Sequence, residues 1–148
     1  MQTVSDPAAY GDGCAEFYDE LYASVEPGLL NCLQQLAGDG PVLELGLGSG
    51  RIAIPLANRG LEVHAVEASS KMLTRFRSKP DAHKVSVIQG DFATLELPVQ
   101  YRLIVSLVST FDLLCSSQRQ QSALDRIAAH LKPDGLFVNE AFECDQVG

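Results

Sequence analysis

The amino-acid sequence predicts an α/β domain with a doubly wound parallel sheet, and three observations lead to this prediction. Short apolar segments typical of strands alternate with segments that have the spacing of helices. The connections between them are short, as in a sheet whose parallel strands are joined by right-handed helical crossovers. The segment 101–109, YRLIVSLVS, is apolar almost throughout, which suits a strand that is buried on both faces.

Composition and charge limit the class of protein. The chain has 148 residues, 46% hydrophobic and 20% charged, so we expect one globular domain of ordinary composition. Its net charge of −8 would repel a phosphate backbone, and we expect no nucleic-acid partner. The first residues lack the apolar core of a signal peptide, and no apolar run is long enough to span a bilayer, so we also expect no membrane partner.

The cysteines lie far apart in the sequence, without a Cys-x-x-Cys pair. They are Cys14, Cys32, Cys115 and Cys144. This spacing argues against a zinc site, and we predict no bound metal. Isolated thiols are typical of a reducing compartment, so we predict a cytoplasmic location.

Two helices are expected before the first strand. Residues 1–13 are small, polar or turn-forming, and we expect a flexible N-terminus that leads into a single domain over 14–148. Residues 14–24 have the apolar spacing of a short helix. A second helix over 27–37 begins with a proline in its first turn and ends at Gly38.

Strands and helices then alternate to the end of the chain. We expect strands at 41–45, 61–67, 84–89, 101–109 and 136–142. Helices are expected at 51–58, from a cap at Ser69 or Ser70 through Ser78, and from a cap at Ser116 or Ser117 through Leu131. Residues 90–98 are expected to form a loop and residues 132–135 a turn. Pro55 cannot donate a backbone hydrogen bond inside the helix at 51–58, so that helix either starts late or is kinked.

A glycine-rich segment directly follows the first expected strand, with Glu44, Gly46, Gly48 and Gly50 at alternate positions. Glycines let the backbone approach a ligand closely, and the following helix offers free N–H groups at its N-terminus. A dinucleotide fingerprint would need glycine where Arg51 stands, and a carboxylate beside the loop is unfavourable for a pyrophosphate. Glu44 suits the ammonium group of an amino acid better. A purely structural turn is the alternative.

Acidic residues also stand at the ends of the next two strands. Glu67 ends the second strand, where an acid can accept hydrogen bonds from both ribose hydroxyls; an ordinary solvated acid is the alternative. Asp91 follows the third strand and can accept from the exocyclic amine of adenine, with Phe92 against the adenine face. Its alternative is a turn cap. Ligands of doubly wound sheets bind at the carboxyl ends of the strands, so these elements together favour one ligand site.

In this order, the segments resemble the motifs of class I S-adenosylmethionine-dependent methyltransferases of the bacterial small-molecule type. The segments are VLELGLGSGRIAIPLA, VHAVEASSKML, IQGDFATL, YRLIVSLVSTFDLL and HLKPDGLFVNEAF. The resemblance runs from about residue 14 to residue 142. It implies a Rossmann-like doubly wound sheet with strand order 3-2-1-4-5 and helices on both faces, and S-adenosylmethionine as the cofactor.

The resemblance also assigns roles to residues of this sequence. The glycine segment with its acid would hold the methionine part of the cofactor, Glu67 the ribose, and Asp91 with Phe92 the adenine. Met72 would pack near the adenine, and the segment 109–113 would face the methyl group. The aromatic residues expected to form a lid are Tyr10, Phe17, Tyr18 and Tyr22. The complete predicted cofactor-binding set is Tyr18, Glu44, Gly46, Gly48, Gly50, Glu67, Ala68, Met72, Asp91, Phe92 and Ser109.

Transfer of an activated methyl group mainly requires that donor and acceptor are positioned, so no catalytic residue is assigned. Asp112 is the best candidate for a base, with a cap or turn role as its alternative; the histidines His64, His83 and His130 are weaker candidates. We expect a methyltransferase, or its cofactor-binding fragment, that acts on a nitrogen or oxygen of a small molecule. The alternatives are a binding module without turnover and a nicotinamide-dependent oxidoreductase domain.

The resemblance ends with the fifth expected strand. Family members continue with a helix and an antiparallel strand pair, so we expect this chain to be C-terminally truncated relative to the family and to lack its last strands. The segment 136–142 would then be a sheet edge with unpaired backbone groups. We therefore expect a homodimer through the strand-five end, and the alternative is a monomer in which residues 143–148 fold back over the edge.

Overall fold

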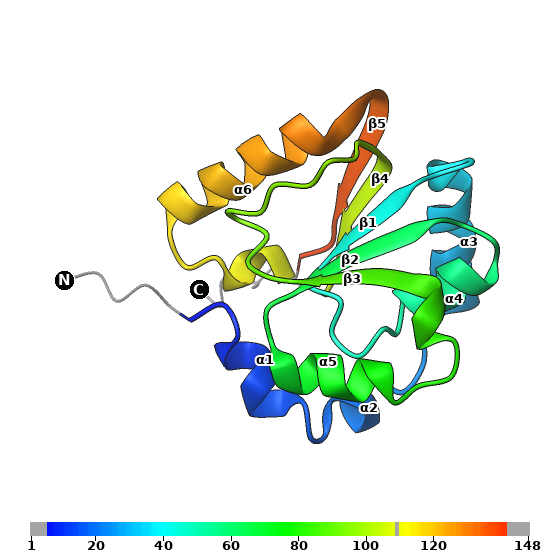
Figure 1. The fold of residues 1–148 in the computed structure, drawn as a ribbon, viewed down its shortest axis with the longest axis vertical. Helices are drawn as coiled ribbons and strands as arrows, with labels where there is room; N and C mark the ends of the chain where they lie inside the picture. Colours follow the sequence, from blue (N-terminus) through cyan, green and yellow to red (C-terminus); the bar gives the residue numbers. More distant parts are fainter. Residues whose placement is uncertain (1–5, 109, 142–148) are drawn as a thin grey trace, which may run out of the picture.

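A computed structural model describes residues 6–108 and 110–141 of the chain (Figure 1). The sheet has five parallel strands in the order β3-β2-β1-β4-β5, which confirms the predicted fold class and strand order. The strands are β1 (Val42–Leu45), β2 (Val63–Glu67), β3 (Val85–Gln89), β4 (Tyr101–Ser106) and β5 (Leu131–Asn139). The α-helices are α1 (Ala9–Cys14), α2 (Tyr18–Leu21), α3 (Pro27–Ala37), α4 (Ala53–Asn58), α5 (Ser70–Arg77) and α6 (Ser117–His130), and the 3-10 helices are η1 (Ala82–Lys84) and η2 (Thr110–Leu113).

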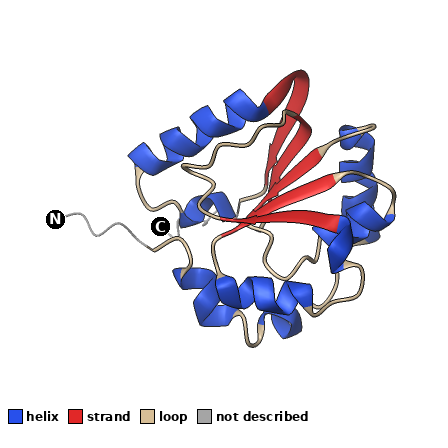
Figure 2. Ribbon diagram, in the orientation of Figure 1, coloured by secondary structure: helices blue, strands red, loops and turns tan. Residues whose placement is uncertain are grey.

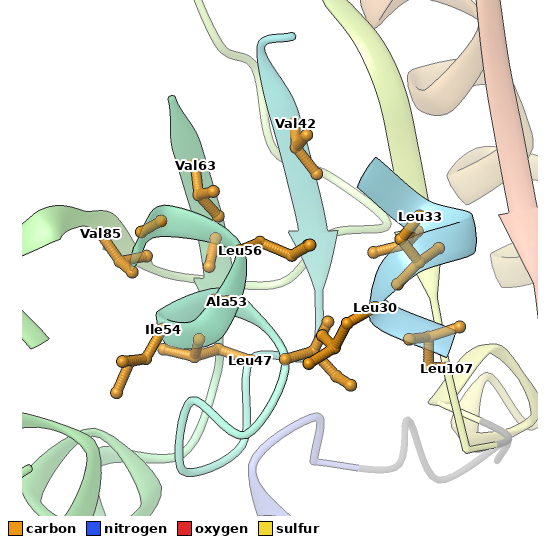
Figure 3. Close-up of a cluster of buried hydrophobic side chains, with 14 of the residues drawn as sticks. Leu30, Leu33, Val42, Leu47, Ala53, Ile54, Leu56, Val63, Val85 and Leu107 are labelled. Carbon is orange, nitrogen blue, oxygen red and sulfur yellow. The ribbon is translucent and has the colours of Figure 1, made fainter. Parts of the chain in front are cut away.

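Helices cover both faces of the sheet (Figure 2). Neighbouring residues of a strand point to opposite faces, so the apolar central strands need cover on both sides. Val42 packs with α3 and α4 in one apolar cluster, whereas Leu43 packs with α6 and the loop after β3 in another. Figure 3 shows the first cluster, in which Leu33 of α3 and Leu56 of α4 belong with Val42 and Val63 of the sheet. Among the residues that the structure describes, no helix is long and apolar enough to cross a membrane.

The N-terminal helix is divided into two pieces and starts earlier than the sequence predicts. Two short helices, α1 and α2, replace the single helix expected over 14–24, and all of α1 except Cys14 lies in the stretch 1–13, where a flexible N-terminus was expected. The Asp6 side chain accepts a hydrogen bond from the N–H of Ala8 at 3.0 Å at the start of α1. Gly11 lets α1 approach α5 closely, since a Cβ at Gly11 would lie only 2.5 Å from the Cβ of Ser69. Local helix propensity does not predict this tertiary contact.

The helix after the first strand starts late, which is one of the two possibilities that Pro55 left open. α4 begins at Ala53 and not at residue 51, so Pro55 lies in its first turn. The backbone N–H groups of a first turn have no partner within the helix, and proline therefore breaks no helical hydrogen bond at this place.

The last two strands differ from the expected ranges at their ends. β4 stops at Ser106, three residues before the expected end at 109, and Val108 has a φ of 53°, a left-handed conformation outside the extended range of regular strands. β5 begins directly after α6 and includes residues 132–135, where a turn was expected. These residues have no partner in the β4–β5 pairing, whose register shifts between Tyr101 and Leu103. Phe142, the expected last residue of this strand, lies outside the described residues.

Candidate functional site

A cavity of about 420 Å³ lies at the carboxyl ends of the strands. The chain order of the strands reverses between β1 and β4, and doubly wound sheets bind ligands at this switch point. The volume is within the range of about 300–1,000 Å³ that is typical of small-molecule sites. Most of the predicted cofactor residues line the cavity, namely Tyr18, Gly46, Gly48, Glu67, Ala68, Met72, Asp91 and Phe92.

The glycine loop, residues 46–50, forms one wall of this cavity. Gly48 has a φ of 59°, and a Cβ at this position would lie 3.0 Å from the hydroxyl oxygen of Tyr18. Glycine is therefore required at 48 both by the backbone conformation and by the close approach of Tyr18. Gly50 does not line the cavity: a Cβ there would lie 2.6 Å from the ring of Phe76, in the core. Its role is to shape the turn into α4.

Glu67 joins the glycine loop to the end of β2. One of its carboxylate oxygens accepts a hydrogen bond from the N–H of Gly48 at 2.7 Å, and the other accepts from the N–H of Ser69 at 2.9 Å. Burial raises the pKa of the Glu67 carboxyl, whereas these backbone hydrogen bonds lower it. Each carboxylate oxygen has a second lone pair, so Glu67 can accept hydrogen bonds from a ligand while it holds the loop.

Glu44 is buried in β1 and is not among the residues that line the cavity. Its Oε2 atom has no hydrogen-bond partner in the described part of the chain. Burial raises the pKa of Glu44 to about 8; attraction to Arg51 lowers it, and repulsion from Glu67 raises it further. A buried acceptor without a partner is unfavourable, so Glu44 is stabilised by any proton or donor group that reaches it.

The β3 turn, residues 90–93, carries the acidic residue expected to recognise adenine. Asp91 Oδ1 accepts a hydrogen bond from the N–H of Ala93 at 3.0 Å, and Asp91 Oδ2 accepts one from Arg119 Nη2 at 2.6 Å. Phe92 packs in the apolar clusters on the α6 side of the sheet and lines the cavity. Sequence reasoning missed Arg119 because it lies 28 residues from Asp91 and belongs to no motif.

The cover segment, residues 6–24, lies over the cavity and includes α1 and α2. Tyr10, Tyr18 and Tyr22 of this segment line the cavity, and the ring centroids of Tyr18 and Tyr22 lie 4.8 Å apart. Burial raises the pKa of Tyr18 to about 12, so its phenol is neutral near pH 7. Phe17, also expected in the lid, is 46% exposed and does not line the cavity.

Two aspartates of the cover segment accept hydrogen bonds from serines in the loops that follow β1 and β2. Asp12 Oδ1 accepts from Ser69 Oγ at 2.6 Å, and Asp19 Oδ1 accepts from Ser49 Oγ at 2.5 Å. Both serines are fully buried. Lys79 also donates to Asp19 at 2.8 Å. Sequence reasoning missed these contacts, since each joins residues 30 or more positions apart.

The segment after β4, expected over 109–113 to face the methyl group, contributes Thr110, which was not named individually. Thr110 lines the cavity, and its side chain occupies the space where a Cβ at Gly46 would stand. Ser109, the predicted residue in this segment, lies outside the described residues. Asp112 lies in η2, is exposed and is not among the residues that line the cavity, so the structure gives no geometric support for a role as base.

The sequence matches known proteins over most of its length. Residues 42–135 match the family described as "Methyltransferase domain". The chain is 31% identical over 137 residues to the cypemycin N-terminal methyltransferase of a Streptomyces species, which covers 89% of this chain and 56% of that protein.

Solved structures agree with this match. The CcbJ methyltransferase from Streptomyces caelestis superposes with a TM-score of 0.81 at 35% identity, over 90% of this chain and 57% of that one. The glycopeptide N-methyltransferase MtfA, complexed with S-adenosyl-L-methionine, superposes with a TM-score of 0.67 at 26% identity, over 75% of this chain and 48% of that one. The chain thus spans about half the length of the relatives it matches. With its sheet order, its strand-end residues and these relatives, the chain belongs to the S-adenosylmethionine-dependent methyltransferases.

Proposed function

We propose that this chain holds S-adenosylmethionine across the carboxyl ends of its strands, as part of an enzyme that methylates a nitrogen or oxygen atom of a small molecule. The observation that carries the proposal is the hydrogen bond from the Gly48 N–H to Glu67. It places a buried carboxylate on the cavity wall, beside a glycine whose backbone a ligand can approach closely. MtfA, a structural relative, has been crystallised with S-adenosyl-L-methionine and with S-adenosyl-L-homocysteine.

The residues of the cavity fit the chemical groups of this cofactor. Gly48 lines the cavity without a side chain, which leaves room for the methionine part. Burial raises the pKa of Glu44 to about 8, and an ammonium group bound near it would favour its ionised form. Glu67 has free lone pairs for the ribose hydroxyls. Asp91 has free lone pairs for the 6-amino group of adenine, with Phe92 beside it on the cavity wall.

The chain's own contribution to the reaction is to orient the cofactor and to shield it from water. The bound cofactor supplies a methyl group on a positively charged sulfur that is already activated for transfer. Tyr18 lines the cavity, and aromatic ring faces attract cations, whereas the ring of Tyr22 already has the Arg51 guanidinium over it at 5.4 Å. The cover segment limits the access of water to the same space. Positioning of donor and acceptor then accounts for most of the rate that such an enzyme needs.

We favour a nitrogen acceptor on a small molecule over a polynucleotide. One relative is named a cypemycin N-terminal methyltransferase, and one structural relative is named a glycopeptide N-methyltransferase. The net charge of −8 also opposes binding to a phosphate backbone.

Calorimetric titration tests the cofactor assignment. We expect S-adenosylhomocysteine to bind with one site per chain and NADH not to bind. Binding of NADH without binding of S-adenosylhomocysteine would overturn the proposal and support an oxidoreductase domain.

Transfer of a radiolabelled methyl group tests the acceptor class, with a panel of small amines, small alcohols and an oligoribonucleotide. We expect label on amines. Label on the oligoribonucleotide contradicts the small-molecule acceptor, and cofactor binding without any transfer identifies a binding module.

Two further parts of the proposal concern the setting of the protein. Cys14, Cys32 and Cys115 are free thiols, a state that the reducing cytoplasm maintains, and we place the protein there. β5 lies at one end of the strand order, with β4 as its neighbour in the described residues, and we propose that two copies associate through this edge. Sedimentation at micromolar concentration tests the association, and a concentration-independent monomer contradicts it.

A further inference from the structure

One face of α6 holds the loop after β3 along most of its length. The α6 residues involved are Arg119, Ser122, Arg126 and His130, at spacings of three, four and four, so they lie on the same side of the helix. Their partners, in the same order, are Asp91 at 2.6 Å, Ala93 at 2.6 Å, Glu96 at 2.6 Å and Leu97 at 2.8 Å. α6 therefore determines where the β3 turn lies.

Among these four α6 residues, Arg119 is the one that lines the cavity. It forms an ion pair with Asp91, and the side chains are 21% and 19% exposed, so water screens the pair only partly. The second oxygen of Asp91 accepts from the backbone N–H of Ala93. Both oxygens of this carboxylate are thus fixed, one by the backbone of its own turn and one by a helix distant in sequence.

We propose that Arg119 is a positioning residue for recognition of the cofactor's base. It holds the Asp91 carboxylate in one orientation, so that the site accepts a 6-amino purine and rejects a 6-oxo purine. This inference rests on the proposed function, because it concerns the adenine of S-adenosylmethionine.

The reason for this selectivity is the immobility of the carboxylate. A 6-oxo purine places a carbonyl oxygen where adenine has its amino group, and two acceptors then face each other without a proton between them. A site built for a hydrogen bond rejects a ligand that lacks the donor, provided that the site cannot rearrange. A carboxylate released from Arg119 can rotate away from the carbonyl, and selectivity falls even if the fold is intact.

The chain contains a matched control for a merely structural role. Arg126 lies seven positions after Arg119 on the same face of α6 and pairs with Glu96 at the same distance of 2.6 Å. It does not line the large cavity. Loss of Arg126 removes a contact between α6 and the same loop, but it leaves Asp91 and its ion pair in place.

The test compares the affinity of S-adenosylhomocysteine with that of S-inosylhomocysteine, its 6-oxo analogue, by calorimetry. We expect the wild-type chain to prefer S-adenosylhomocysteine by about 10–100-fold, the cost of one unsatisfied buried acceptor. Arg119→Met should reduce this preference to less than about 3-fold, and Arg119→Lys, which retains the charge, should restore part of it. Arg126→Met should keep the wild-type preference even where its melting temperature falls.

The outcomes separate the inference from the proposed function. If Arg119→Met weakens both ligands equally and keeps the wild-type preference, the role of Arg119 is only structural and the inference is wrong. If Arg119→Met does not fold, the affinity ratio of the two ligands is measured in Arg119→Lys, and a full wild-type ratio there contradicts the inference. Equal affinity of the wild-type chain for both ligands also overturns the inference, while the proposed function stands. Absence of S-adenosylhomocysteine binding to the wild-type chain refutes the proposed function itself.

Discussion

The glycine loop and the cover segment both line one cavity, yet different interactions hold these two sides in place. The glycine loop is held by a backbone hydrogen bond to buried Glu67 and by packing of Gly50 against the core. The cover segment is held by side chains, among which the ion pair of Asp19 with Lys79 is about one-third exposed. Exposed ion pairs contribute little to stability, whereas buried backbone contacts are costly to break. We therefore expect the cover segment to open for the ligand while the glycine loop remains fixed.

Gly48→Val gives the largest effect, because it disturbs both sides at once. Valine at a φ of 59° is strained, and its Cβ would lie 3.0 Å from the Tyr18 hydroxyl oxygen, in the space assigned to the cofactor. We expect affinity for S-adenosylhomocysteine to fall by more than about 100-fold, which corresponds to roughly 2.8 kcal/mol, measured by calorimetry.

Gly28→Val is the control for this substitution. Gly28 lies in α3 with no atom within 4 Å of an added Cβ, and it is exposed. We expect this variant to bind as the wild type does. Full affinity in a folded Gly48→Val chain would show that the loop does not contact the ligand.

Glu67→Ala comes next and tests the fixed side alone. It removes the acceptor of the Gly48 and Ser69 N–H groups, together with the carboxylate assigned to the ribose. We expect binding of S-adenosylhomocysteine to weaken by about 1–3 kcal/mol in calorimetry. Glu62→Ala, at an exposed acid just before the same strand, is the control and should leave affinity unchanged. Equal affinities of wild type and Glu67→Ala would refute the ribose assignment.

The fixed side of the cavity was readily predicted from the sequence, because position along a strand determines it. Glu67 and Asp91 come at the ends of successive strands, and the parallel order brings those ends to one edge. Gly50 and Glu44 were predicted as cofactor contacts by the same motif, but neither lines the cavity. A motif gives the spacing of residues, but it does not tell which of them face the ligand and which shape the turn behind it.

The cover segment and the α6 contacts could not be predicted in this way. The bonds of Asp12 with Ser69 and of Arg119 with Asp91 join residues 57 and 28 positions apart, and neither pair has a spacing that marks it. The early start of α1 also depends on contact with α5 and not on helix propensity alone. Local patterns therefore specified the part of the site that the sheet builds, and tertiary side-chain contacts specified the rest.

Glu44→Gln tests whether ionisation of a buried carboxyl beside the glycine loop lowers the stability of the folded chain. Because burial raises the pKa of Glu44 from the ordinary 4.5 to about 8, the folded chain binds a proton between these values that the unfolded chain has lost. Stability is therefore lost as the pH rises from about 4.5 through 8. Glutamine does not ionise, so we expect Glu44→Gln to match the wild type near pH 5 and to be more stable at pH 8.5, by about 1–3 kcal/mol. Thermal unfolding across this pH range measures the difference, and parallel curves for the two proteins would contradict it.

Asp19→Asn gives the smallest effect and addresses the contacts that hold the cover segment, including the bond from Ser49 of the glycine loop. Burial opposes ionisation of Asp19, but hydrogen bonds from Lys79, Ser49 and Arg75 outweigh it and lower the pKa to about 2. The contribution of this carboxylate is therefore present above its ordinary pKa of 3.8 and is lost as the pH falls toward 2. Near neutral pH the wild type has the full set of contacts, and the asparagine variant lacks the charge that binds Lys79 and Arg75.

We expect Asp19→Asn to speed amide hydrogen exchange in residues 6–24 by about 2–5-fold, the effect of losing a partly exposed ion pair. Exchange at the Gly48 N–H should not change, because its bond to Glu67 does not involve Asp19. Salt at about 1 M screens the ion pairs of the wild type, so the difference between the two proteins should shrink there. Glu20→Gln is the matched control, since Glu20 is the exposed neighbour of Asp19 in α2. If Glu20→Gln and Asp19→Asn give equal exchange rates, the ion pairs do not hold the cover segment, and the contrast between the two sides of the cavity must then rest on packing alone.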